Sequence, residues 1–134
     1  MTTPNETSAE DRFAYLIPEQ FVRLTTYRKD GTAVPTTIWF TYDQGKLYFT
    51  TQKQAGKAKR IRNNGRVEVT PSDRVGNLLG LPPVEGHALE VTDAEYDHAQ
   101  SVLRQKYGQQ FDQIASASGS SSRTYFVISP LAGK

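Results

Sequence analysis

Residues 21–51 contain three runs of alternating side chains separated by two tight turns, which limits the chain to an antiparallel arrangement. The runs cover residues 21–27, 32–42 and 47–51. Asp30-Gly31 separates the first two runs, and a Gly-Lys pair at 45–46 precedes the third. Asp-Gly between alternating runs is a strong signal for a β-hairpin. Three strands joined by short turns form a meander, so the sequence predicts an antiparallel sheet.

The second run has two different faces, one apolar and one partly polar. Its apolar face comprises Val34, Ile38, Phe40 and Tyr42, and its other face comprises Thr37, Trp39 and Thr41. Threonines beside a tryptophan make a surface that is polar enough to line a pocket and flat enough to hold an aromatic ring. The sequence leaves the alternative open that Trp39 is ordinary core packing.

The rest of the chain adds three strands, a short helix and a longer one. We expect strands at 66–71, 83–91 and 123–129 and a short helix at 54–63 with Ala58 and Ile61 on its apolar side. Thr92-Asp93-Ala94-Glu95 has the pattern of a capping box. It predicts the start of a helix whose apolar positions are Ala99, Val102, Leu103, Tyr107, Phe111 and Ile114.

Six strands with few helices in one short chain predict a small, mainly β barrel. We expect a polar tail at residues 1–12 and a single domain at 13–134, because 134 residues fit one compact domain. The absence of a long apolar run and of a leader-like N-terminus predicts a soluble, cytoplasmic protein that does not bind membranes.

Composition removes several kinds of active site. The chain has no cysteine and only two histidines, His87 and His98, which excludes thiol nucleophiles, cysteine-bound metals and multi-histidine metal sites. No nucleophile motif accompanies either histidine, and no pair of carboxylates stands out for acid–base chemistry. The sequence therefore identifies no catalytic residue and predicts no metal; any reaction would depend on a cofactor.

The net charge of +2 conceals an uneven distribution. Residues 53–66 contain six of the 16 lysines and arginines and no acid, which leaves 10 bases against 14 acids elsewhere. This basic segment follows a strand that ends in Thr50-Thr51-Gln52, and it includes Gly56, Lys57 and Arg60. Hydroxyl groups, a glycine and a basic helix start are typical of a phosphate site. A solvated basic helix face is the simpler interpretation of the same residues.

The succession of motifs along the chain is more specific than any of them alone. It comprises 24–31 (LTTYRKDG), 34–40 (VPTTIWF), 45–51 (GKLYFTT), 56–64 (GKAKRIRNN), 84–88 (VEGHA) and 106–108 (KYG). Together they resemble the pyridoxamine 5′-phosphate oxidase-like split β-barrel superfamily. Within it, they resemble the flavin/deazaflavin oxidoreductase branch, whose members use FMN or coenzyme F420.

This resemblance implies a six-stranded antiparallel split β-barrel of the FMN-binding type that forms a homodimer, with the cofactor in a groove between the protomers. By position, Lys57 and Arg60 would bind the cofactor phosphate together with Gly56. Thr50, Thr51 and Gln52 would contact the ribityl chain or the phosphate. Along the ring system would lie Pro35, Thr36, Thr37 and Trp39. Ala55 departs from the family pattern, which often has Ser there.

Four functions follow from these observations. The first is an oxidoreductase that transfers hydride between coenzyme F420 and a small organic substrate, with Lys53, Lys59 and Arg62 attracting the cofactor's carboxylate tail. The second uses FMN instead. The third is a protein that binds a flavin or haem without turnover. The most remote is a nucleic-acid-binding barrel with exposed Tyr27, Trp39 and Tyr48, which the acidic remainder of the chain disfavours. We therefore expect no nucleic-acid partner.

Overall fold

The computed structural model describes residues 13–16, 19–73, 77–81, 83–111 and 123–130. The predicted tail at 1–12, the predicted core residue Ile114 and the 116–122 segment lie outside these ranges. The chain forms η1 (Ala14–Leu16), β1 (Phe21–Tyr27), β2 (Ala33–Trp39), β3 (Thr41–Asp43), β4 (Lys46–Gln52), α2 (Gly56–Asn63), β5 (Arg66–Ser72), β6 (Val84–Glu90), α3 (Asp93–Tyr107) and β7 (Arg123–Pro130).

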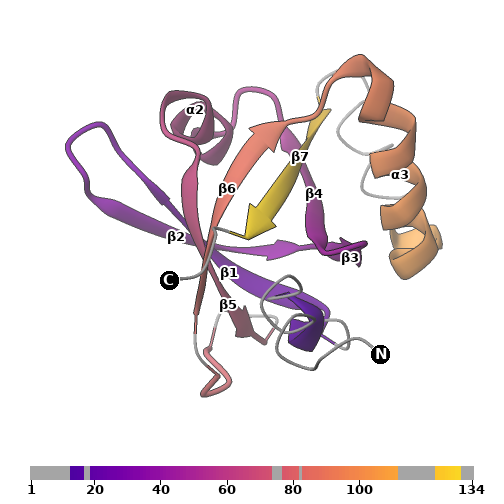
Figure 1. The fold of residues 1–134 in the computed structure, drawn as a ribbon, viewed down its shortest axis with the longest axis horizontal. Helices are drawn as coiled ribbons and strands as arrows, with labels where there is room; N and C mark the ends of the chain where they lie inside the picture. The colour runs from indigo at the N-terminus through magenta and orange to yellow at the C-terminus, as the bar shows by residue number, and fades with distance from the viewer. Residues whose placement is uncertain (1–12, 17–18, 74–76, 82, 112–122, 131–134) are drawn as a thin grey trace, which may run out of the picture.

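The strands form one antiparallel sheet in the order β2-β1-β5-β6-β7-β4-β3. Its two outer strands, β2 and β3, are consecutive in the chain and only Phe40 separates them. The sheet is therefore strongly curled, and the chain itself joins its two ends (Figure 1). The mainly β, antiparallel prediction is confirmed.

The predicted number of six strands is wrong, because the run at 32–42 is two strands. Phe40 leaves the β-ladder and bonds to a side chain instead: its N–H donates to the Tyr107 hydroxyl oxygen (3.0 Å), and its carbonyl accepts from the same hydroxyl (2.6 Å). The Tyr107 hydroxyl also lies 2.7 Å from the Gln20 carbonyl oxygen. The chain consequently pairs with β1 before Phe40 and with β4 after it.

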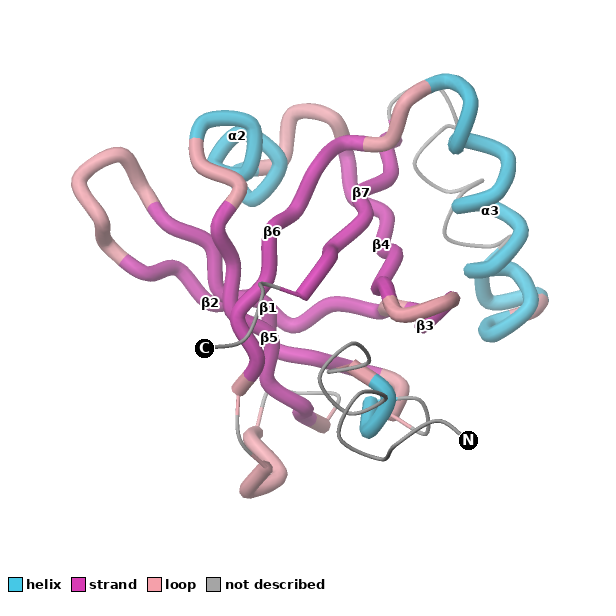
Figure 2. Tube along the Cα trace, viewed as in Figure 1, coloured by secondary structure: helices cyan, strands magenta, loops and turns pink. Residues whose placement is uncertain are grey.

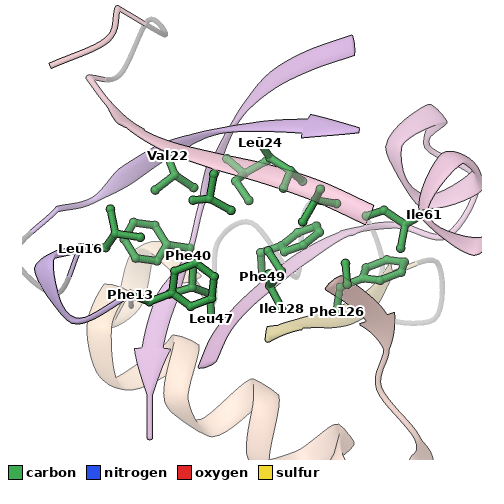
Figure 3. Close-up of a cluster of buried hydrophobic side chains, with 14 of the residues drawn as sticks. Phe13, Leu16, Val22, Leu24, Phe40, Leu47, Phe49, Ile61, Phe126 and Ile128 are labelled. Atoms are coloured by element: carbon green, nitrogen blue, oxygen red, sulfur yellow. The ribbon is translucent and has the colours of Figure 1, made fainter. Parts of the chain in front are cut away.

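The main core fills the inside of the curled sheet (Figure 3). Ile61 of α2 lies at one end of this cluster, and Phe13 and Leu16 lie at the other. Ala58 and Ile61 are buried as predicted, so α2 is fixed to the barrel by its apolar side. Gly86 permits the close β6–β7 packing, since a Cβ there would lie 2.8 Å from both the Ile128 side chain and the Ser129 carbonyl oxygen.

A second core lies outside the sheet, between α3 and the strands β3, β4 and β7. The predicted apolar positions of α3 from Ala99 to Tyr107 are buried there, as is Phe111 beyond the end of the helix. Thr92 is the N-cap as predicted, but its side chain makes no capping hydrogen bond, so the capping-box geometry is not formed. Neither helix among the described residues is long and apolar enough to span a membrane.

Trp39 and Lys106 reinforce the junction between β2 and β3. The Trp39 indole stacks on the Tyr107 ring with centroids 4.6 Å apart. The Lys106 ammonium lies 3.8 Å above the Phe40 ring and donates to the Glu19 carbonyl. Burial lowers the pKa of Lys106 to about 8 and raises the pKa of Tyr107. The end of α3 thus holds the point where the sheet closes.

We expect Tyr107→Phe to lower the free energy of unfolding by about 2–4 kcal/mol, because it leaves the buried N–H and carbonyl of Phe40 without their partner. Urea denaturation followed by tryptophan fluorescence measures the change. As a control, Tyr27→Phe on the outer face of β1 should change the value by less than about 0.5 kcal/mol. Equal stability of wild type and Tyr107→Phe would contradict this role for the hydroxyl.

Candidate functional site

Lys57 of α2 and Thr51 of β4 come together as the sequence predicts. The Lys57 ammonium lies 3.5 Å from the Thr51 hydroxyl oxygen. Burial lowers the pKa of Lys57, and the nearby charges of Arg60 and Arg123 lower it further. The N-cap of α2 is Ala55, which offers no capping hydroxyl to the first helical N–H groups. A half-buried cation therefore lies at a helix start that lacks its usual side-chain acceptor.

Arg60 lies one helical turn beyond Gly56 and folds back over it. A Cβ at Gly56 would come within 2.9 Å of a guanidinium nitrogen of Arg60, so the missing side chain makes room for this conformation. Arg60 Nε also donates to the Thr26 hydroxyl oxygen at 2.6 Å, which joins α2 to β1. Burial and the neighbouring Arg28 lower the pKa of Arg60.

Arg123 is a member of this cluster that the sequence did not indicate. It lies opposite Gln52 in the β4–β7 pairing, and its Nε donates to the Thr50 hydroxyl oxygen at 3.3 Å. Burial lowers the pKa of Arg123. The sequence also did not indicate Thr26, the partner of Arg60. Both lie far from the basic segment in sequence, and only the strand pairing could have identified them.

We call Lys57, Arg60 and Arg123, with the hydroxyl groups of Thr50 and Thr51, the cation cluster. In the described part of the chain, no carboxylate contributes to the pKa of Lys57 or Arg60. Desolvated like charges without a neutralising carboxylate are typical of a site for an external anion. The simpler interpretation of a solvated basic face does not account for their burial.

Arg62 does not belong to the cluster, contrary to its expected part in attracting a carboxylate tail. Its guanidinium forms two bonds of 2.9 Å with the carboxylate oxygens of Glu90. Lys53 also lowers the pKa of Glu90, so it too lies near that carboxylate. Of the three cations expected to attract a tail, only Lys59 has no described acidic neighbour here.

The four predicted residues of β2 do not share a face. Pro35 and Thr37 are exposed, whereas the Thr36 hydroxyl lies 3.5 Å from the Leu24 carbonyl oxygen of β1. Trp39 stacks on Tyr107, in agreement with the alternative that this tryptophan is ordinary core packing. Strand alternation accounts for the division, since neighbouring side chains point to opposite sides. Strand alternation likewise directs the side chains of Thr50 and Thr51 to opposite faces of β4.

A cavity of about 230 Å³ extends the site beyond Arg60, toward the turn between β1 and β2. Its lining residues are Tyr27, Arg28, Lys29, Lys59, Arg60 and Asn63. Among these there are four cations and no acid. Figure 1 shows this turn beside α2, and Figure 2 shows α2 and α3 (cyan) at separate places on the sheet. This basic cavity is thus bordered by four cationic residues, whereas the surface that they expose inside it is mainly apolar.

The two histidines lie outside the cation cluster. His98 of α3 lies 2.8 Å from a carboxylate oxygen of Asp43 and packs against the edge of the Tyr48 ring. The His87 ring lies against Gly65. Within the described ranges, no group of three or more histidines and acids is placed to hold a metal ion. Tyr48 is buried, so it is not the exposed stacking surface that a nucleic-acid-binding barrel would need.

A family model described as pyridoxamine 5′-phosphate oxidase matches residues 10–134. No curated protein matches the sequence. Among solved structures, a haem storage protein from Vibrio cholerae, HutZ, has a TM-score of 0.70 at 15% identity over 93% of this chain and 92% of that one. An FAD-binding protein from Mesorhizobium loti has a TM-score of 0.62 at 20% identity, over 98% of this chain and 89% of that one. General Stress Protein 26 from Bacillus anthracis has a TM-score of 0.65 at 18% identity, over 92% of this chain and 89% of that one.

The like charges around Lys57 should be unfavourable for folding when no anion is bound. Because the folded pKa of Lys57 is lowered, the unfolded state binds its proton more tightly, and the stability of the wild type should rise as pH increases through this pKa. We expect Lys57→Met to be more stable than wild type at pH 7, with the difference shrinking toward pH 10. Thermal denaturation across this pH range measures it. A less stable variant at pH 7 would contradict the expectation.

Proposed function

The chain belongs to the pyridoxamine 5′-phosphate oxidase family, and on that premise we propose that it is an oxidoreductase that binds a flavin-type cofactor at the cation cluster. The preferred cofactor is the deazaflavin coenzyme F420, and FMN is the alternative. The reaction is hydride transfer to or from a small organic substrate.

The observation that supports this function best is the half-buried Lys57 ammonium near Arg60 and Arg123 at the start of α2, where in the described part of the chain no carboxylate contributes to the pKa of Lys57. A cofactor phosphate fits it chemically, because Lys57 and Arg60 supply charge and the Thr51 hydroxyl lies within reach of Lys57. Gly56 leaves the backbone at the start of α2 accessible, and Ala55 leaves its first N–H groups without a side-chain cap. These groups can bind the phosphate oxygens.

The remaining predicted residues have distinct proposed roles. Thr50 and Gln52 flank the cluster on β4 and would contact the ribityl chain or the phosphate. Pro35 and Thr37, which are exposed, would lie along the ring system. Thr36 would contribute through its main chain, since its side chain faces Leu24. Trp39 would border the ring with the part of the indole that Tyr107 leaves uncovered.

When bound, the cofactor would supply the hydride chemistry, so the protein need not provide a nucleophile or a redox-active side chain. The protein's own residues would bind the phosphate, orient the ring against the sheet and exclude water. In the described part of the chain, neither histidine belongs to the cation cluster, and Glu90 is bonded to Arg62. The proton that accompanies the hydride would be exchanged with water.

The edge of the sheet at β2 supports a homodimer. In the described structure α3 packs on β3, β4 and β7 and α2 packs on β1 and β6, whereas β2 lies at the edge of the sheet away from α3. This edge includes exposed Pro35 and Thr37. Packing of a second copy there would bury the surface and enclose a ring lying along β2. The groove would then be completed by the partner.

Two observations bear on the choice between F420 and the other ligands. The basic cavity around Tyr27, Lys59 and Arg60 favours a cofactor with a further anionic extension, such as the oligocarboxylate tail of F420, over FMN. The FAD-binding and haem storage proteins have the same fold, which keeps FMN binding and binding without turnover as alternatives.

We expect the purified protein to bind F420 with micromolar or tighter affinity and FMN more weakly, because only F420 has a tail for the basic cavity. Fluorescence titration with each cofactor measures the affinities, and sedimentation of the complex should give a mass of two chains with two cofactors. Micromolar binding of FMN together with no binding of F420 would overturn the preference for the deazaflavin. Failure to bind either would overturn the proposed function.

We expect Lys57→Met to weaken cofactor binding by about 1–3 kcal/mol, the size of a charge-assisted hydrogen bond. Without cofactor, the same variant should be more stable to unfolding than wild type. A substitution that weakens ligand binding but stabilises the fold indicates a residue that serves binding rather than folding. Lys46→Met is the control, because Lys46 is exposed at the start of β4, six residues before its end. Unchanged affinity of Lys57→Met would remove Lys57 from the phosphate site.

A further inference from the structure

Glu90 at the end of β6 pairs with Arg62 of the basic segment. Its carboxylate accepts two bonds of 2.9 Å from Arg62 of α2 and one of 2.5 Å from the Thr124 hydroxyl of β7. Arg62 in turn donates to the Lys53 carbonyl oxygen at 2.9 Å. One carboxylate therefore connects α2, the loop before it and β7.

This network ends beside the cation cluster. Thr124 is the direct cross-strand neighbour of Thr51, the residue that accepts from Lys57, and both threonines are buried. Side chains paired across an antiparallel ladder have Cβ atoms about 4.5–5.5 Å apart. The Thr124 carbonyl also accepts from the Thr50 hydroxyl at 2.9 Å. Glu90 is thus connected to both hydroxyl groups of the cation cluster through Thr124.

The position of α2 depends on the same contacts. Two apolar residues, Ala58 and Ile61, hold the helix on the barrel. The bidentate contact between Arg62 and Glu90 fixes its last turn, and the bond to Lys53 fixes the loop that leads into it. A planar guanidinium paired with a carboxylate defines direction as well as distance. Lys57 and Arg60 take their place from this arrangement.

We propose that Glu90 is a positioning residue for the phosphate site, which it builds through Arg62 and Thr124 without contacting the ligand. This inference rests on the proposed function. Electrostatics alone makes the opposite prediction, because removing a carboxylate beside a cation cluster and releasing Arg62 would strengthen the binding of any anion. The sign of the effect therefore distinguishes positioning from charge.

The test compares Glu90→Gln with wild type in binding FMN and riboflavin, and in binding F420 and its phosphate-free deazaflavin riboside. We expect Glu90→Gln to weaken binding of the phosphorylated ligand about three- to tenfold, which is within the range of couplings between contacting residues, and to leave the phosphate-free ligand within twofold of wild type. Equal or tighter binding of the phosphorylated ligand would overturn the proposal. Equal weakening of both ligands would also overturn it, since it would indicate a general structural defect.

Two controls make the experiment specific. Glu85→Gln removes another carboxylate of β6, which pairs with Arg66 at 2.8 Å. Its affinities for the phosphorylated and the phosphate-free ligand should both stay within twofold of wild type. The double variant Glu90→Gln/Arg62→Gln should bind no more weakly than the weaker single variant, because the two residues act as one unit. Additive losses would contradict this coupling. If wild type does not prefer the phosphorylated ligands, the proposed phosphate site itself fails, and Glu90 has no such site to position.

Discussion

The buried hydroxyl of Tyr107 is the interaction on which the sheet's closure depends. A strand cannot pair with β1 and β4 in one unbroken ladder while the sheet curls back on itself, so the backbone at Phe40 must leave the ladder. Its polar groups are buried and need partners. One phenol from a helix 67 residues away accepts from the Phe40 N–H and donates to the Phe40 carbonyl, and its oxygen also lies 2.7 Å from the Gln20 carbonyl oxygen. The second core around α3 delivers this group to the junction.

The candidate site depends on a different balance, between charge and position. Arg60 and Arg123 both disfavour the charged form of the half-buried Lys57, so the fold must hold these cations together against their repulsion. The apolar side of α2 and the strand pairing of β4 with β7 supply this constraint. The adjoining acid, Glu90, is bonded to Arg62 instead. The chain is thus prepared for an anion, at a cost to its stability without one.

Local patterns predicted most of the fold. The strands, the short helix and the buried positions of α3 follow from periodicities of two and 3.6, which the sequence displays directly. The break at Phe40 could not be predicted, because it follows from a contact with Tyr107 that exists only after folding. The same holds for Arg123 and Thr26, which join the site through strand pairing. The contact of Lys57 with Thr51 was accessible because the end of β4 and the basic segment are neighbours in the sequence, but the bond of Arg60 to Thr26 and the pairing of Arg62 with Glu90 were not.

The single-residue link between β2 and β3 also has a consequence for how the protein reaches its native state. The β1–β2 and β3–β4 pairings are local and can form early, whereas the junction needs the end of α3 and the strand β7, which are made last. Closing such long-range contacts carries the largest loop entropy in the chain. We therefore expect an open, curled sheet to precede the closed one during folding. While it lasts, the apolar inner face of the sheet is uncovered, and this stage is where association between chains competes with folding.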